Sequence, residues 1–255
     1  MKKYITISAL IFILCAGGFL LFLPQVYVVP ILTYHHVNDT SFPDCPTVTP
    51  ETLEWQMAFL KKRGYNVISL DELVEGIRSE REFPRNTVVL TFDDGYVDNY
   101  TKAFPILKKY DFPALMFIGA ETIDGGFMSL EQIVEMIDSG IDFGSHGVRQ
   151  LYLPDEDIET MRKEIFESKR MLEEKLGIEI RHFCYPIGGY TSRAKALVHA
   201  AGYKSAYTTN RGPNRFNWDV YSLQRIKPDD NDTAITFWMK LSGYYNLFRS
   251  ERKPH

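Results

Sequence analysis

The chain has 255 residues, of which 45% are hydrophobic and 24% are charged, a balance typical of one large globular domain. Its formal net charge is −4, and it has no basic patch with interleaved aromatic residues, which argues against a nucleic-acid-binding protein. Its three cysteines are too few for a fold that depends on disulfides.

The N-terminal segment differs from the rest of the chain. After Met-Lys-Lys comes an uncharged, mostly apolar run from Tyr4 to Leu23, which ends before a proline. About 20 apolar residues suffice for a helix to cross a bilayer, and the basic start would stay in the cytoplasm. We therefore expect residues 1–25 to be a single-pass membrane anchor that places residues 26–255 outside the cytoplasm. A cleaved signal peptide is the alternative, although the sequence around Cys15 is a poor cleavage site.

The remaining residues alternate between short apolar runs and helical patterns. The first helix is predicted at Thr49-Pro50-Glu51, where a capping residue, a proline and an acid follow one another, and it ends at Gly64. Runs that predict strands cover 26–34, 67–69, 87–92, 114–118, 141–143, 182–185 and 205–208. Further helices are predicted over 129–138, 158–176, 194–201 and 233–247.

Strands that alternate with helices predict repeated β-α units around a mostly parallel sheet. The composition does not change along residues 26–255, so we expect a single α/β domain there. No glycine-rich phosphate or dinucleotide loop follows any predicted strand, which favours a closed or distorted (β/α) barrel over an open doubly wound sheet. In such barrels the chemistry gathers at the C-terminal ends of the strands.

Two adjacent carboxylates, Asp93 and Asp94, follow the most hydrophobic predicted strand. Their mutual repulsion is costly unless a bound cation offsets it, keeping one carboxylate as a ligand and leaving the other to handle protons. A simple turn is the alternative, since Asp-Asp-Gly is common in turns.

Other polar residues also follow predicted strands. His146 lies just after the strand at 141–143, and His35 and His36 follow the first strand. An imidazole there can bind a metal or act as a general acid, but a lone histidine can also be an ordinary buried polar residue. The Pro/Gly loop at 183–190 can aim backbone N–H groups at an oxyanion, or serve only as a tight connection.

Taken together, these segments resemble the polysaccharide deacetylases of carbohydrate esterase family 4, which share the NodB homology domain. The resemblance covers nearly everything after the N-terminal segment. It rests on an ordered set of motifs: TFDDGY (91–96), GSH (144–146), FxYPxGxY (183–190) and LQRI (223–226). The opening ILTYHHV (31–37) resembles the branch that deacetylates biofilm poly-N-acetylglucosamine, in which the general-acid histidine lies early in the chain.

This resemblance implies a barrel of the NodB type and a hydrolase that removes N-acetyl groups from an amino-sugar polysaccharide with a divalent metal, typically zinc. It implies that Asp94 and His146 bind the metal and that Asp93 is the general base. His35 would be the general acid that protonates the departing amine. His36 suits this role less well, because neighbouring side chains of an extended segment point in different directions.

Three supporting roles are implied by the same resemblance. The backbone N–H near Ile187 would help to hold the oxyanion, and Tyr185 and Tyr190 would contact the substrate. Arg225 would keep Asp93 ionised and oriented through an ion pair; a purely structural salt bridge is the alternative.

The sequence departs from the family at the second metal-binding histidine. Four residues after His146, where the family has the third ligand, stands Gln150, whose oxygen is a weaker zinc ligand than an imidazole. Gly147 and Ile187 also differ from the common residues. We expect a site formed by Asp94, His146 and Gln150; a harder metal, or a domain without catalysis, are the alternatives.

The expected substrate is therefore an amino-sugar polysaccharide, and we expect the protein to be a monomer. A degenerate domain that only binds glycan is one alternative, for which aromatic residues in the loops could stack on sugars: Tyr152, Tyr190, Phe216 and Trp218. A glycosidase with paired carboxylates is the other, but the sequence offers no second acid in a comparable place. Cys45 and Cys184 either pair or remain free thiols.

Overall fold

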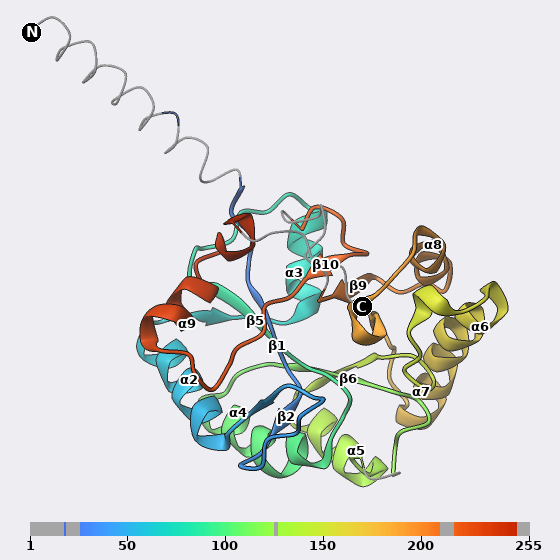
Figure 1. Ribbon diagram of the computed structural model, residues 1–255, viewed down its shortest axis with the longest axis horizontal. Helices are drawn as coiled ribbons and strands as arrows, with labels where there is room; N and C mark the ends of the chain where they lie inside the picture. The colour runs from blue at the N-terminus through green and yellow to red at the C-terminus, as the bar shows by residue number, and fades with distance from the viewer. Residues whose placement is uncertain (1–17, 19–25, 125–126, 210–216, 249–255) are drawn as a thin grey trace, which may run out of the picture.

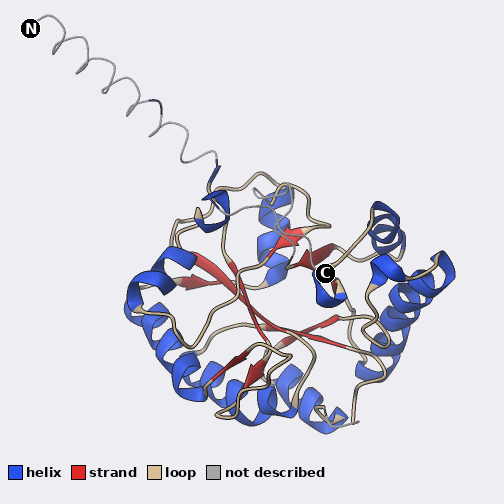
Figure 2. Ribbon diagram, in the orientation of Figure 1, coloured by secondary structure: helices blue, strands red, loops and turns tan. Residues whose placement is uncertain are grey.

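The computed structural model describes residue 18 and residues 26–124, 127–209 and 217–248. In these ranges a parallel sheet of eight strands is surrounded by helices (Figure 1, Figure 2). The strand order is β1-β5-β6-β7-β8-β9-β10, and β4 pairs with β5. The strands are β1 (Ile31–Tyr34), β4 (Asn66–Val67), β5 (Thr87–Phe92), β6 (Leu115–Ile118), β7 (Asp142–Ser145), β8 (His182–Cys184), β9 (Ser205–Thr208) and β10 (Leu223–Gln224).

The two edges of this sheet approach each other and nearly close it into a barrel. Leu32 of β1 forms a parallel bridge with Ile226, which follows β10. The Thr33 N–H donates to the Ile226 carbonyl at 2.9 Å, and the Ile226 N–H donates to the Ile31 carbonyl at 2.8 Å. The predicted (β/α) barrel is therefore confirmed. A separate small sheet, β2 (His36–Val37) and β3 (Thr47–Val48), follows β1.

Helices cover the outside of the strands (Figure 2). They are α2 (Pro50–Lys62), α3 (Leu70–Arg78), α4 (Phe104–Tyr110), α5 (Leu130–Asp138), α6 (Ile158–Arg162), α7 (Ser168–Leu176), α8 (Ser192–Ala200) and α9 (Ala234–Lys240). Two π-helical turns, η2 (Asn99–Ala103) and η4 (Lys163–Glu167), precede α4 and α7, and three short 3₁₀ turns are η3 (Leu153–Asp155), η5 (Pro186–Gly188) and η6 (Tyr245–Phe248). Several helices begin where a side chain accepts a backbone N–H, as capping predicts: Thr49, Ser69, Ser129, Asp157, Thr191 and Thr233.

The barrel interior and the outer layer form separate apolar clusters. Alternate residues of the strands point inward, and α3 covers the N-terminal ends of the strands. The interior cluster contains Ile31, Val89, Leu115, Phe117, Cys184, Tyr207 and Leu223 from the strands, with Leu70, Leu73 and Val74 from α3. The same alternation brings Thr33, Thr91 and Asp93 to the inner face at the other end of the barrel.

Some predicted elements differ from the observed ones. The strand expected at 67–69 is β4, one residue earlier, and Ser69 instead caps α3, a helix that the sequence analysis did not predict. The C-terminal helix ends at Lys240 rather than Leu247. Gly243 turns the chain there with φ +78°, and a Cβ at this position would lie 2.2 Å from the Tyr27 ring.

The anchor predicted over residues 1–25 lies outside the described residues, apart from Gly18. Within the part of the chain that the structure describes, none of the helices has the length and apolar character needed to cross a membrane. Cys45 and Cys184 are free thiols.

Candidate active site

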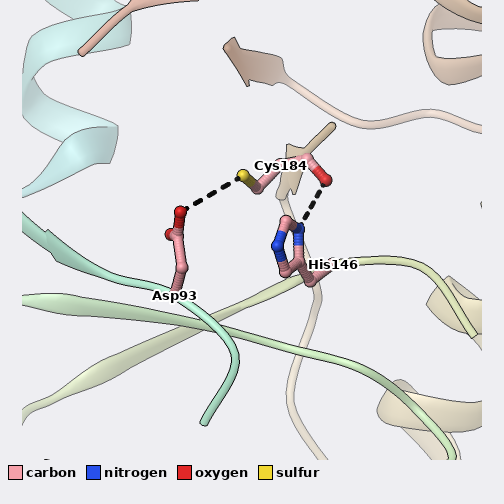
Figure 3. Close-up of side chains that lie close together, drawn as sticks. All are labelled: Asp93, His146 and Cys184. Carbon is pink, nitrogen blue, oxygen red and sulfur yellow. Dashed lines mark hydrogen bonds between the residues drawn. The ribbon is translucent and has the colours of Figure 1, made fainter. Parts of the chain in front are cut away.

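The polar residues that follow the strands meet at the C-terminal end of the barrel, called the mouth below. Asp93 and Asp94 follow β5, and His146 follows β7. His35 follows β1, and Arg225 follows β10. Figure 3 shows that Asp93 lies beside the Cys184 sulfur and that His146 faces the Cys184 backbone carbonyl. Parallel strands that are distant in the sequence thus deliver their charged residues to one place.

Asp93 forms a buried ion pair with Arg225. The two guanidinium nitrogens donate to the two carboxylate oxygens at 2.7 and 2.6 Å, and Thr33 Oγ1 donates to one of these oxygens at 3.3 Å. Burial alone would raise the pKa of Asp93, but the positive charge of Arg225, with a contribution from His35, lowers it to about 2. Asp93 is therefore a carboxylate at neutral pH, fixed in orientation by two parallel hydrogen bonds.

Asp94 and His146 face each other on another side of the mouth. Asp94 Oδ1 lies 3.4 Å from His146 Nε2, and His146 Nδ1 donates to the Cys184 carbonyl at 2.9 Å. Because a carbonyl can only accept, this bond places a proton on Nδ1 and directs Nε2 at Asp94, where a deprotonated Nε2 can bind a cation. Burial raises the pKa of Asp94, but the hydrogen bond and charge of His146, together with the charge of His35, outweigh this and lower it.

A carboxylate oxygen and an imidazole nitrogen at this separation fit a divalent metal. A second set of donor atoms, from Asp93, His146 and Cys184, lies within 4.8 Å of one another (Figure 3). However, Arg225 donates to both Asp93 oxygens and to Cys184 Sγ at 3.0 Å, so its positive charge occupies that side. The edge between Asp94 and His146 is therefore the better place for a cation.

Gln150 lies next to this edge. It adopts a left-handed backbone conformation with φ +61°. Its side chain packs over Gly119 at the end of β6, where a Cβ would come within 3.2 Å of Cγ and Nε2. The strand β6 pairs with both β5 and β7, which carry Asp94 and His146. Gln150 Nε2 is buried and has no hydrogen-bond partner among the described residues, so the amide remains available to another group.

His35 approaches Asp93 from β1, whereas His36 turns away. His35 Nε2 lies 3.8 Å from Asp93 Oδ2, and burial lowers the pKa of His35. The His36 ring instead stacks between Phe42 and Tyr96, at centroid distances of 4.0 and 3.5 Å. Its Nδ1 lies 2.7 Å from an Asp98 oxygen.

The loop after β8 holds the remaining predicted residues. Ile187 has φ +57°, a strained conformation for a β-branched residue, and its side chain is 62% exposed. Tyr185 is fully buried, and its hydroxyl donates to the Tyr221 carbonyl at 3.0 Å, so the substrate contact expected of its ring does not fit the structure. Tyr190 stacks on Tyr185 at 4.7 Å.

The other aromatic residues considered for sugar stacking are dispersed. Tyr152 packs over Gly189, close to the loop after β8. Trp218 lines a cavity with Tyr27 and Val28, which precede β1, and so lies near the opposite end of the barrel from the mouth. Phe216 lies outside the described residues.

Several contributors to this site were not predicted from the sequence. Thr91 lies two residues before Asp93 on the same face of β5, and its hydroxyl accepts from Arg225 at 3.2 Å. Because side chains alternate between the two faces of a strand, the position of Thr91 two residues before Asp93 could have predicted that both face the same side. The partners of His36, and the closeness of Cys184 to Arg225, depend on contacts between distant segments that carry no local signal.

Sequence comparisons with known proteins point to the polysaccharide deacetylases, the family that the motifs resemble. A family model described as polysaccharide deacetylase matches residues 80–206. The Bacillus subtilis protein YxkH, assigned by name to the polysaccharide deacetylases, is 28% identical over 209 residues, which are 82% of this chain and 74% of that protein. A Staphylococcus epidermidis protein named poly-beta-1,6-N-acetyl-D-glucosamine N-deacetylase is 26% identical over 210 residues, 75% of this chain and 72% of that one.

Solved structures agree in fold. The Streptococcus pyogenes deacetylase PplD, solved in complex with acetate, has a TM-score of 0.76 and 29% sequence identity. The similarity covers 84% of this chain and 99% of that chain. The barrel described above is therefore shared over nearly the whole length of PplD.

Proposed function

Because this chain belongs to the polysaccharide deacetylase family, we propose that it removes N-acetyl groups from an N-acetylglucosamine-containing polysaccharide of the cell surface or matrix, using a divalent metal, zinc in the first place. The observation that carries the proposal is the placement of an ionised Asp93, the Asp94–His146 edge and His35 at one end of the barrel. The name of the Staphylococcus epidermidis relative supports the choice of polymer.

Asp94 and His146 would hold the metal, with Gln150 as a third, neutral ligand. A metal bound there supplies Lewis acidity, which polarises the acetyl carbonyl and lowers the pKa of a nearby water. The backbone N–H near Ile187 would add a hydrogen bond to the developing oxyanion.

The protein's own groups move the protons. Asp93 accepts a proton from the attacking water, and Arg225 keeps the carboxylate ionised and oriented for this role. The water oxygen bonds to the acetyl carbon, the carbon–nitrogen bond breaks, and His35 gives a proton to the departing nitrogen. The products are acetate and a free amine, so the polymer gains positive charge.

A domain that binds glycan without catalysis is less well supported. Such a domain has no need for a general base fixed by two charged hydrogen bonds within 3.8 Å of a histidine, yet both are present here. Of the aromatic residues considered for sugar stacking, Tyr190 packs on the buried Tyr185, and Trp218 lies near the opposite end of the barrel.

We also propose that residues 1–25 anchor a monomeric domain to the outer face of the cell membrane. The chain enters the barrel at residues 26–30, before β1, whereas the catalytic groups follow the strands at the other end. An anchor at that position would leave the mouth open to a polymer. Protease treatment of intact cells should degrade the domain, and light scattering of the detergent-solubilised chain should give one copy; protection until the cytoplasm is opened would contradict this placement.

Metal analysis of the purified full chain, paired with acetate release from N-acetylglucosamine oligomers, tests the catalytic proposal. We expect about one divalent ion per chain and acetate release that a chelator removes and added zinc restores. His146→Ala should lose both the ion and the activity, because it removes the imidazole ligand. Acetate release that persists in a metal-free chain would overturn the metal's role, and glycan binding without any release would favour the non-catalytic alternative.

A further inference from the structure

The side chain of His35 has little to hold it in place. Its Nε2 lies 3.8 Å from Asp93, too far for a hydrogen bond, and its buried Nδ1 has no hydrogen-bond partner among the described residues. A general acid must nevertheless lie at hydrogen-bond distance from the atom that it protonates, and a misplacement of about 1 Å can lower the rate roughly 100-fold. The orientation of His35 must therefore come from its backbone and its neighbours.

Two adjacent residues, Asp98 and Asn99, bind the backbone around His35. Asn99 Nδ2 donates to the His35 carbonyl at 2.7 Å. The two Asp98 oxygens receive the Val37 N–H at 3.2 Å and His36 Nδ1 at 2.7 Å. These three contacts bridge more than 60 positions of sequence and fix the chain at the His35 carbonyl and over the two residues that follow it.

The local fold around this pair is unusual. Asn99 opens the π-helical turn η2, directly after the loop that follows Asp93 and Asp94. A π turn is rare and is frequently found at functional sites. Asn99 is fully buried and Asp98 nearly so. Asn99 Nδ2 also donates to an Asp98 oxygen at 3.2 Å, so the two side chains act as one unit.

We infer that Asp98 and Asn99 are positioning residues for the general acid of this enzyme. They hold the segment 35–37 so that the His35 imidazole faces Asp93 across the mouth, and they keep the His36 ring away from Asp93. Asp98 and Asn99 are together called the clamp below. Asp93 and Asp94 lie on the loop directly before this turn, so the base, a metal ligand and the residues that hold the acid belong to one short segment, 93–99. This inference rests on the proposed function, since it assigns a role in the same reaction.

The leaving group distinguishes a positioning role from a merely structural one. Cleavage of an N-acetyl sugar expels an amine, which needs a proton from the acid, whereas 4-nitrophenyl acetate expels a stable phenolate, which needs none. We expect Asn99→Ala to lower kcat for acetate release from N-acetylglucosamine oligomers about 100-fold, with KM within about threefold of the unaltered chain. Hydrolysis of 4-nitrophenyl acetate and the bound metal should stay within about threefold.

Further variants sharpen this test. His35→Ala should give the same pattern, and the double variant His35→Ala, Asn99→Ala should be no slower than His35→Ala alone, because both remove one function. Asp98→Asn keeps an oxygen for the Val37 N–H and should lose less than Asp98→Ala. Lys102→Ala is the matched control, because Lys102 is exposed on the same π turn and should leave both reactions unchanged.

Three results would overturn the inference. Equal losses on the amide and the ester in Asn99→Ala, with a lower melting temperature, would assign the residue to stability alone. Full amide activity in both Asn99→Ala and Asp98→Ala would show that nothing depends on the clamp. An unaltered chain that releases acetate from neither substrate would overturn the proposed function, and this inference with it.

Discussion

The barrel buries a histidine beside a carboxylate at each of its two ends. At the mouth, His146 Nε2 lies 3.4 Å from Asp94; at the N-terminal end, which α3 covers, His182 Nε2 lies 3.4 Å from Asp71. The two pairs have the same separation, and both histidines are almost fully buried. Distance and burial alone thus do not distinguish a reactive pair from a structural one.

The surroundings of the two carboxylates do distinguish them. Asp71 is neutralised by the protein itself, with Arg181 at 2.8 Å and Lys204 at 3.8 Å. Among the described residues, Asp94 has no lysine or arginine within 4 Å, and both Asp94 and Gln150 adopt left-handed conformations. An incompletely neutralised carboxylate and a left-handed backbone favour a cation site at Asp94, whereas Asp71 already has two cationic side chains beside it and needs no bound ion.

The largest contrast between the two ends should come from replacing one carboxylate at each, the general base Asp93 at the mouth and Asp71 at the covered end. Asp93→Asn should lower acetate release about 1000-fold, because it removes the general base, while metal affinity changes only a few-fold, because both Asp93 oxygens face Arg225. Asp71→Asn should leave the rate within about threefold. Acetate release and calorimetric metal titration measure these effects.

Stability provides the control for this contrast. Asp93→Asn leaves Arg225 buried without a counter-charge, which costs about 3–5 kcal/mol of unfolding free energy, so rates should be compared well below its melting temperature. An Asp71→Asn chain that loses as much activity as Asp93→Asn, without being less stable, would erase the distinction between the two ends.

A smaller effect is expected from restoring an imidazole at the mouth. Gln150→His should raise zinc affinity at least about tenfold, or ~1.4 kcal/mol, because an imidazole is a better zinc ligand than an amide oxygen. Histidine also tolerates the left-handed backbone at this position. Gln150→Leu, of similar size but without a donor atom, should weaken binding. If neither variant changes the calorimetric affinity, Gln150 does not contact the metal.

Sequence patterns predicted the barrel because they are local and repeated. The run at 87–92 and the capped helix starts are encoded by neighbouring residues, and the motifs placed Asp93, Asp94 and His146 directly after strands. The helix α3 was not predicted because Ser69, the residue that caps it, was assigned to the end of the strand expected at 67–69. The observed strand β4 has only two residues and ends before Ser69. The strand β10 has only two residues, too few for a period of two to be recognised.

The finer parts of the site could not be predicted in the same way. The clamp of Asp98 and Asn99 depends on a π turn and on contacts with residues more than 60 positions earlier. The burial of Tyr185 depends on how the loop after β8 packs against Tyr221. Which residues face the mouth is thus set by tertiary packing, even where the residue types are recognised correctly.

The smallest predicted effect concerns the covered end of the barrel and pH. Burial lowers the pKa of His182, although Asp71 opposes this. Between that lowered pKa and the unfolded value of about 6.5, the unfolded chain binds more protons than the folded one. The contribution of a neutral His182 to stability is therefore complete above about pH 6.5 and is lost as the pH falls, at about 1.4 kcal/mol for each unit of difference between the two pKa values.

Comparison with His182→Gln isolates this contribution, because the other titrating groups are common to both chains. The glutamine can still bond to Ser205, which lies 2.8 Å from His182 Nδ1, but it does not titrate. The difference in unfolding free energy between the two chains, measured by urea denaturation, should be largest near pH 8 and narrow below about pH 6.5. A difference that widens in acid would mean that His182 is buried as a cation paired with Asp71.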